Sequence, residues 1–241
     1  MYKNFFNLFN NISTVPFAIV SSILYLLIHI FLHKVLLLNN NYKKIKYKRK
    51  TYILTNISKS IVLSVICFMF LTAIKKNDIN LLNTINWDKN NQVLINFTTL
   101  YSITDIIGLF INKKMMLSTI IHHICVFFGW LYVINSDFSK EGLFKPLIIY
   151  GCFSSTAFII NLYLGSRFII PIFLKNILKK ICYYNYLISI TFNWLWQIFY
   201  LTIYIYLNCN NVYSMIAICL YIILLYNWVK DDLILIKYLK E

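Results

Sequence analysis

The chain has 241 residues, of which 60% are hydrophobic and 18% aromatic, whereas only 13% are charged. A soluble domain carries about 25% charged and about 45–50% apolar residues, so a soluble globular fold is excluded. The formal net charge of +15 would suit nucleic-acid binding. The basic residues, however, stand in short connections between long apolar runs, as they do in membrane proteins. Nucleic acid is therefore not an expected partner.

Seven apolar segments approach the roughly 20 residues that a helix needs to span the hydrocarbon core. They cover residues 16–38, 55–74, 92–111, 115–135, 146–164, 181–207 and 211–229. The stretch 165–180 holds Pro171 and a short apolar run, and we expect it to form an interfacial loop or half-helix. The sequence thus predicts an all-α fold, a polytopic integral membrane helical bundle of about seven transmembrane helices. We expect a single transmembrane domain over residues 1–241.

Lys and Arg are distributed unevenly between the alternate connections of this bundle. If the amino terminus lies outside the cytosol, 15 of the 23 basic residues fall on the cytosolic side and six on the other. Lys34 and Lys59 lie inside segments, and Lys59 is expected to extend along its helix to the interface. The positive-inside rule therefore predicts a lumenal or outer amino terminus and a cytosolic carboxyl terminus.

Asp105 is the only acidic residue well inside a predicted span. Charged groups at membrane depth are costly, which makes each of them a candidate functional residue. On a helical wheel Asp105 shares one face with polar or small residues at spacings of three, four and seven. These residues are Thr98, Tyr101, Gly108 and Asn112.

Two adjacent histidines, His122 and His123, stand on the following segment at a matching depth. A short turn through Lys113 and Lys114 predicts that the third and fourth segments form an antiparallel hairpin. Asp105 lies eight residues before Lys113 and His122 nine after it. At 1.5 Å per residue, both lie roughly 12–13 Å from the cytosolic end. We expect Asp105 to pair with His122 and the pair to line a cavity in the cytosolic half of the bundle.

Two interpretations of this pair remain open. In one, Asp105 and a histidine join two helices because each buried polar group needs a partner. In the other, Asp105 orients an imidazole that acts as a general base or holds a lipid headgroup. Adjacent histidines favour the second interpretation, because joining the helices needs only one of them.

A metal site is a weaker prediction. His29 and His33 share a face of the first segment, as two ligands of one metal would, but His33 lies near the expected interface. The six cysteines are scattered without ligand-like spacing, and we interpret them as buried apolar residues. The sequence therefore predicts neither a bound metal nor a cofactor.

The stretch from Tyr101 to Asp105, the Lys113-Lys114 turn and the His122-His123 pair resemble the central signature of the TLC domain. Ceramide synthases and translocating-chain-associated membrane proteins share this domain. The resemblance covers a core of approximately residues 50–240, and implies that Asp105, His122 and His123 form a site for membrane lipids. Ceramide synthases carry acidic residues in the next helix, whereas residues 148–164 of this chain hold none.

Three functions follow from these observations. The first is a divergent, non-acyltransferase member that binds or regulates membrane lipids in the endoplasmic reticulum or a related host membrane. The second is an acyl-CoA-dependent lipid N-acyltransferase, with acyl-CoA as co-substrate. There His122 or His123 would act as the general base, oriented by Asp105. The third is an intramembrane metallohydrolase that uses His29, His33, His122 or His123 as metal ligands.

Cysteine-accessibility labelling tests the predicted topology. Lys46→Cys and Lys140→Cys, each introduced into a chain without its native cysteines, should react from opposite sides of the membrane. Labelling of both positions from the same side would contradict the helix count and the orientation together.

Overall fold

The computed structural model describes residues 7, 9–76, 79, 81, 87, 91–112 and 115–241. Within these residues the chain forms helices and no strand. The elements are α2 (Thr14–Leu36), α3 (Asn40–Lys43), α4 (Tyr47–Lys75), α5 (Asn91–Ile111), α6 (Leu117–Ile134), α7 (Phe144–Ser154), η2 (Ser155–Ala157), α8 (Phe158–Ser166), α9 (Ile172–Asn208) and α10 (Val212–Lys240).

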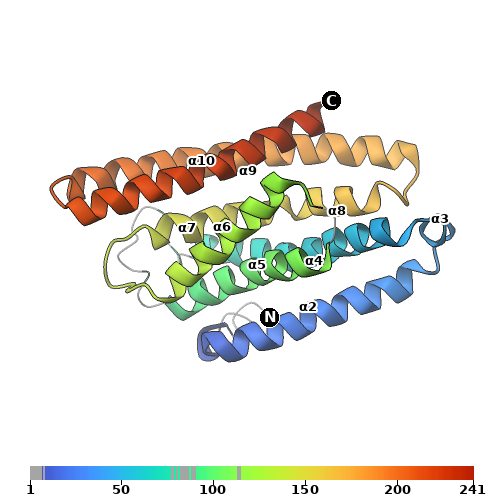
Figure 1. Ribbon diagram of the computed structural model, residues 1–241, viewed down its shortest axis with the longest axis horizontal. Helices are drawn as coiled ribbons and strands as arrows, with labels where there is room; N and C mark the ends of the chain where they lie inside the picture. Colours follow the sequence, from blue (N-terminus) through green and yellow to red (C-terminus); the bar gives the residue numbers. More distant parts are fainter. Residues whose placement is uncertain are drawn as a thin grey trace.

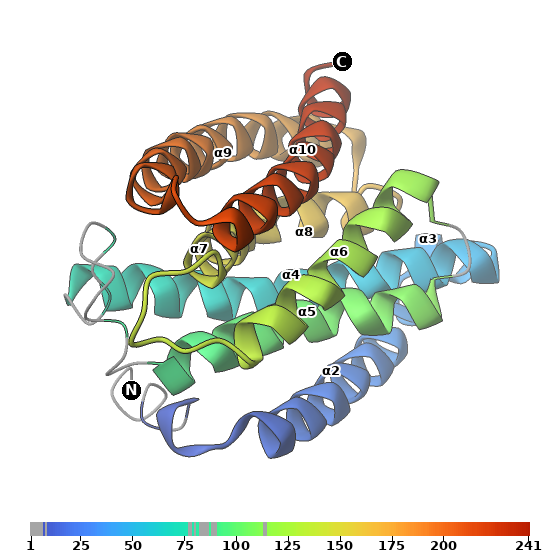
Figure 2. The same ribbon diagram turned by 60° about the vertical axis from the view of Figure 1, so that its left-hand side comes forward.

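Seven helical segments are long and apolar enough to cross a membrane: α2, α4, α5, α6, the continuous α7–η2–α8 unit, α9 and α10. Successive segments run in alternating directions (Figure 1). The helices α4 and α5 occupy the middle of the bundle, between α2 on one side and the α9–α10 pair on the other (Figure 2). The predicted all-α bundle of seven spans is confirmed, and the chain is a multi-pass membrane protein.

The expectation of a loop or half-helix over residues 165–180 was correct for the loop at residues 167–171 but wrong in its extent. Only the short connection between Ser166 and Ile172 is non-helical, and α9 then continues for 37 residues. Pro171 is the N-cap of this helix, with φ of −60°. A proline at the start of a helix loses no intrahelical hydrogen bond, because the first N–H groups have no partner there anyway. Pro171 therefore begins the helix instead of interrupting it.

The fifth span is broken by one turn of 3₁₀ helix at η2. Ser155 Oγ donates to the carbonyl of Cys152 at 2.5 Å, and Thr156 Oγ1 donates to that of Phe153 at 2.7 Å. Hydroxyl groups that bond back to a preceding turn compete with the helical ladder and bend helices. The Ser-Ser-Thr run thus accounts for the junction between α7 and α8.

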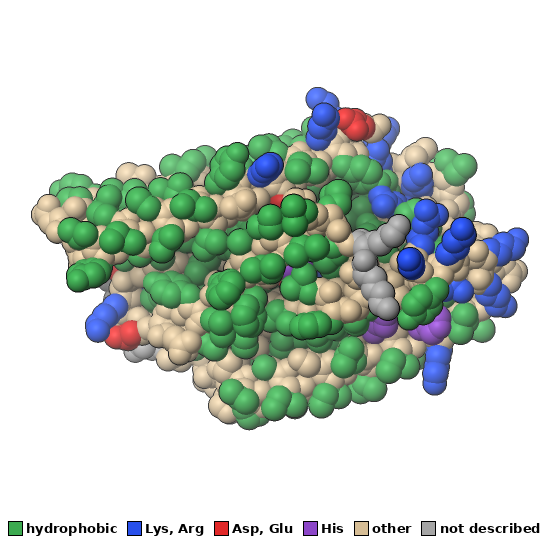
Figure 3. Space-filling view, in the orientation of Figure 1, with side chains coloured by type: hydrophobic (Ala, Val, Ile, Leu, Met, Phe, Trp, Pro, Cys, Tyr) green, Lys and Arg blue, Asp and Glu red, His purple; other side chains and the backbone are tan. Residues whose placement is uncertain are grey.

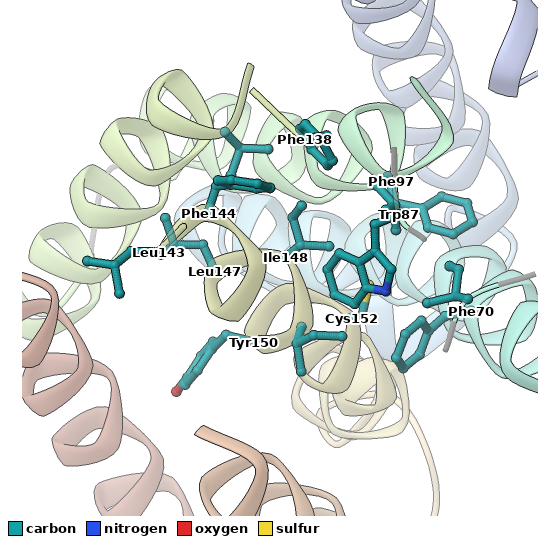
Figure 4. Close-up of a cluster of buried hydrophobic side chains, with 14 of the residues drawn as sticks. Phe70, Trp87, Phe97, Phe138, Leu143, Phe144, Leu147, Ile148, Tyr150 and Cys152 are labelled. Carbon is teal, nitrogen blue, oxygen red and sulfur yellow. The ribbon is translucent and has the colours of Figure 1, made fainter. Parts of the chain in front are cut away.

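The interior packs around an apolar cluster that joins α4, α5 and α7 near one end of the bundle. Figure 4 shows Phe70, Phe97 and Trp87 together on one side of this cluster, with Phe138 and Phe144 on the other. Outside, long apolar side chains cover the body of the molecule, while Lys and Arg gather mainly at the end that carries α3 (Figure 3). A bilayer solvates such an apolar exterior, and the basic residues are concentrated at one end of the bundle.

Gly165 allows α8 to pack closely against α4. A Cβ atom at this position would lie 2.6 Å from Cγ1 of Ile57 and 3.0 Å from the carbonyl oxygen of Ile53. The backbone oxygen cannot rotate away as a flexible side chain could. Small residues at helix crossings are how membrane helices bring their backbones together.

Gly165→Ala should therefore lower the free energy of unfolding by about 1–3 kcal/mol, because the extra methyl group overpacks the crossing. Thermal unfolding in detergent measures the change. Gly108→Ala on α5 is the matched control, since a Cβ there would come no closer than 3.7 Å to another side chain. An equal loss in both variants would contradict the close approach at Gly165.

Candidate functional site

Asp105, on α5, lies where α4, α5 and α6 meet, and its side chain has no solvent exposure. Lys59 reaches it from α4, where its Nζ forms an ion pair with Oδ1 of Asp105. His123 reaches it from α6, with Nδ1 at 3.0 Å from the same oxygen. An unpaired charge in an apolar interior has a high free-energy cost, and the contacts among these side chains reduce that cost. The cluster therefore joins α4, α5 and α6 through one carboxylate.

His122 occupies the outer edge of this cluster. Its Nε2 lies 4.0 Å from Oδ2 of Asp105, and its Nδ1 lies 3.7 Å from Oδ2 of Asp231 on α10. Both distances exceed a hydrogen bond. Within the described residues, Asp105 Oδ2 and the Nδ1 atoms of both histidines have no hydrogen-bond partner, so the 3.0 Å approach of His123 to Asp105 is a close contact without hydrogen-bond geometry. His122 thus stands between two carboxylates without bonding to either of them.

Two sequence-based expectations about these residues were wrong. The closer partner of Asp105 is His123 and not His122, because the buried stripe of α6 runs through His123, Val126 and Gly129. Lys59 does not extend to the interface, and its ammonium group turns inward to Asp105. α4 packs against α5, and this packing brings the Asp105 carboxylate within reach of Lys59.

Sequence analysis missed the acidic pair of α10. The last span was expected to end at residue 229, whereas α10 continues to Lys240 and carries Asp231 and Asp232. Asp232 is buried and accepts hydrogen bonds from the hydroxyl groups of Tyr150, at 2.6 Å, and Tyr186. The neighbouring Lys230 made the segment look like a basic tail, although its apolar pattern resumes at Leu233.

An aromatic contact connects the two polar groups. The Trp228 ring lies 6.5 Å from the His122 ring and 4.7 Å from the Tyr150 ring, measured between centroids. Trp228 is itself buried. The tyrosine hydroxyls hold Asp232, and the Trp228 ring contacts both Tyr150 and His122. Asp231 alone of the two acids faces His122.

The histidines of α2 do not join this cluster. His33 Nδ1 lies 2.9 Å from the hydroxyl oxygen of Tyr42, next to the basic end of the bundle. Burial raises the pKa of the Tyr42 hydroxyl to about 12. Across the described part of the chain, no three His, Cys, Asp or Glu side chains converge as metal ligands would. The ligand set that a metallohydrolase needs is therefore missing from these residues.

The narrow crevice found in the bundle does not meet the expectation of a cavity beside Asp105 and the histidines. An apolar crevice between α4, α5 and α7 is lined by Ile66, Phe97, Thr98, Tyr101, Ile148, Gly151 and Cys152. Neither Asp105 nor the two histidines line it. The polar cluster is open on the side where two of its side chains are partly exposed. These are His122, at 15%, and Asp231, at 27%.

Comparison with known proteins adds no relative: no family model, no curated protein and no solved structure matches this chain. Fold and site alone therefore define the class of protein. It is an all-α, multi-pass membrane protein with a buried Lys–Asp–His cluster and a second histidine at the cluster's edge.

Lys59→Met should lower the free energy of unfolding by about 3–5 kcal/mol, because it leaves a buried carboxylate without its cation. Asp105→Asn should be destabilising for the converse reason. The double variant should lose less than the sum of the two, since neither charge then remains to be compensated. Thermal unfolding of all four proteins in detergent provides this double-mutant cycle.

Lys140 and Asp137 form the matched control, an exposed ion pair of 3.2 Å with side chains that are 79% and 56% exposed. The same cycle at this pair should give a coupling of about 1 kcal/mol or less. Additive losses at Lys59 and Asp105 would show that the buried pair is not coupled.

Proposed function

We propose that this protein binds or regulates membrane lipids through the site formed by Asp105, His122 and His123. The observation that supports this proposal is that the His122 side chain is partly exposed and forms no hydrogen bond with either neighbouring carboxylate. A neutral imidazole offers one donor and one acceptor. A headgroup that carries a hydroxyl, amine or amide could bond to the ring of His122 at its partly exposed edge.

The surroundings of the site favour a lipid as the ligand. His122 and Asp231 lie on α6 and α10, whose exposed side chains are mostly apolar, so the bilayer surrounds the open edge between them. A buried polar atom without a partner costs free energy, and a polar headgroup drawn into this edge would recover it. The paired histidines and the aspartate that resemble the TLC signature are also the residues that meet here.

We also propose that the protein resides in the endoplasmic reticulum or a related host membrane. Its amino terminus would be lumenal or outside, and its carboxyl terminus cytosolic. The described basic residues of α3, of the start of α4 and of the α8–α9 connection lie near one end, which supports this orientation. Lys113 and Lys114, which also entered the count, lie outside the described residues, as do Lys3 and Lys89.

Acyl-CoA-dependent lipid N-acylation is the second candidate, and Asp231 is the observation that favours it. The acidic residue that an enzyme would place beside the histidines is absent from α7 and α8, but α10 supplies one. In this alternative His122 accepts the proton of a lipid amine as the nitrogen attacks the thioester carbonyl. A C–N bond forms, the C–S bond breaks, and the coenzyme A thiolate leaves and takes up a proton.

His122→Ala combined with His123→Ala should reduce the amount of specific lipid that co-purifies with the protein by roughly tenfold, the effect of losing one or two hydrogen bonds to a charged site. Quantitative lipidomics of the detergent-purified proteins measures this change. His29→Ala, on α2 and outside the cluster, is the matched control. An unchanged lipid profile in the double variant would contradict lipid binding at this site.

The same preparations separate the two candidates when they are given acyl-CoA and a sphingoid base. We expect the wild-type protein to form no more N-acylated product than the double-histidine variant. Robust product formation that depends on His122 and is reduced by Asp231→Asn would replace the first proposal with the second.

A further inference from the structure

A second group of charged and aromatic residues lies at the basic end of the bundle, on α4, on α10 and in the α8–α9 connection. The guanidinium groups of Arg49 and Arg167 lie 4.9 Å and 4.8 Å from the centroid of the same Phe168 ring. Arg167 also donates hydrogen bonds to the hydroxyl groups of Tyr238 and, at 3.5 Å, Tyr52. We call these five residues the arginine platform.

The platform has an excess of positive charge. Within the described part of the chain, no carboxylate lies within ion-pair distance of Arg49 or Arg167, since the observed pairs use other residues. Lys179 adds a third cation at 5.6 Å from the Tyr238 ring. The Nε of Arg167 is buried and has no hydrogen-bond partner among the described groups. Cations held this closely together favour a bound anion.

The helix dipole stabilises the positive charge of only one of the two arginines. Arg167 directly follows the last turn of α8, where a cation is stabilised by the negative end of the helix dipole. Arg49 stands in the first turn of α4, where the dipole is positive and disfavours a cation. The helix dipole therefore does not stabilise Arg49 as it does Arg167, whereas an anion shared by the two arginines would stabilise both.

The platform lies beside a segment suited to the headgroup layer. At 1.5 Å per residue the 37 residues of α9 extend for about 55 Å, well beyond a hydrocarbon core of about 30 Å. Its first turn exposes Ile172 and Phe173, at 77% and 72%, and Lys175 follows them. Apolar residues interleaved with lysines are typical of segments that lie in the membrane interface.

We propose that the arginine platform binds the phosphate group of an anionic membrane phospholipid. Two guanidinium groups can each donate paired hydrogen bonds to phosphate oxygens, which a lysine cannot do. The exposed apolar turn of α9 would contact the acyl chains of the same lipid. This site is separate from the Asp105 cluster and does not depend on the function proposed for it.

The test uses the full-length protein in neutral detergent, titrated with phosphatidylglycerol, phosphatidylcholine or inorganic phosphate, with binding followed by microscale thermophoresis. Arg49→Gln combined with Arg167→Gln should weaken phosphatidylglycerol binding about tenfold or more. Lys43→Gln combined with Lys44→Gln removes the same charge from the same end of the bundle, and it should keep the wild-type affinity. Phosphatidylcholine and inorganic phosphate should not displace phosphatidylglycerol.

Each contrary outcome overturns the proposal. An equal loss in the lysine variant would mean that diffuse charge attracts the lipid, and displacement by inorganic phosphate would identify a site for the free anion. If the glutamine variant fails to fold, Arg49→Lys combined with Arg167→Lys keeps the charge and removes the paired hydrogen bonds. Unchanged affinity in that variant would rule out the arginine geometry as the cause of binding.

Discussion

The constraint on which the rest of the structure depends is the burial of one carboxylate at membrane depth. Asp105 has no exposed side-chain surface, so its charge must be compensated by the protein itself. Lys59 supplies the opposite charge from α4, and His123 lies against the same carboxylate oxygen from α6. A rotation or a shift of one turn in any of these helices would separate the charges. The ion pair therefore fixes the relative positions of α4, α5 and α6, and through them the place of His122.

The second half of the bundle uses the same principle with different groups. Asp232 is held by Tyr150 and Tyr186, so that α7, α9 and α10 share one carboxylate as α4, α5 and α6 share another. The close packing at Gly165 joins the halves through α4 and α8. His122 and Asp231 face each other where α6 meets α10, and neither is fully buried. The partly exposed polar groups thus lie between two buried carboxylates, each held by side chains of its own half of the bundle.

The sequence predicted features that depend on local pattern and on depth. The lengths of the apolar runs located the seven spans, and equal distances from one turn brought Asp105 to the level of the histidines. The sequence did not predict features that depend on how neighbouring helices face one another. Lys59 was assigned to the interface because its partner lies on another helix, and Asp231 was overlooked because α10 was expected to end before it. Choosing between His122 and His123 likewise required the packing of α6, because adjacent residues differ by only about 100° around a helix.

The adjacency of Asp231 and Asp232 gives α10 a further property. Side chains of consecutive helical residues diverge by about 100°, so one turn of α10 presents its two acids to two separate neighbourhoods. Tyrosine hydroxyls hold Asp232 in place, and the rotation of α10 that they fix also determines the direction in which Asp231 faces His122. Any twist of α10 that drew Asp231 toward the imidazole would pull Asp232 against that anchor. A rotation of α10 at the edge of the histidine pair would therefore also change its hydrogen bonds to α7 and α9.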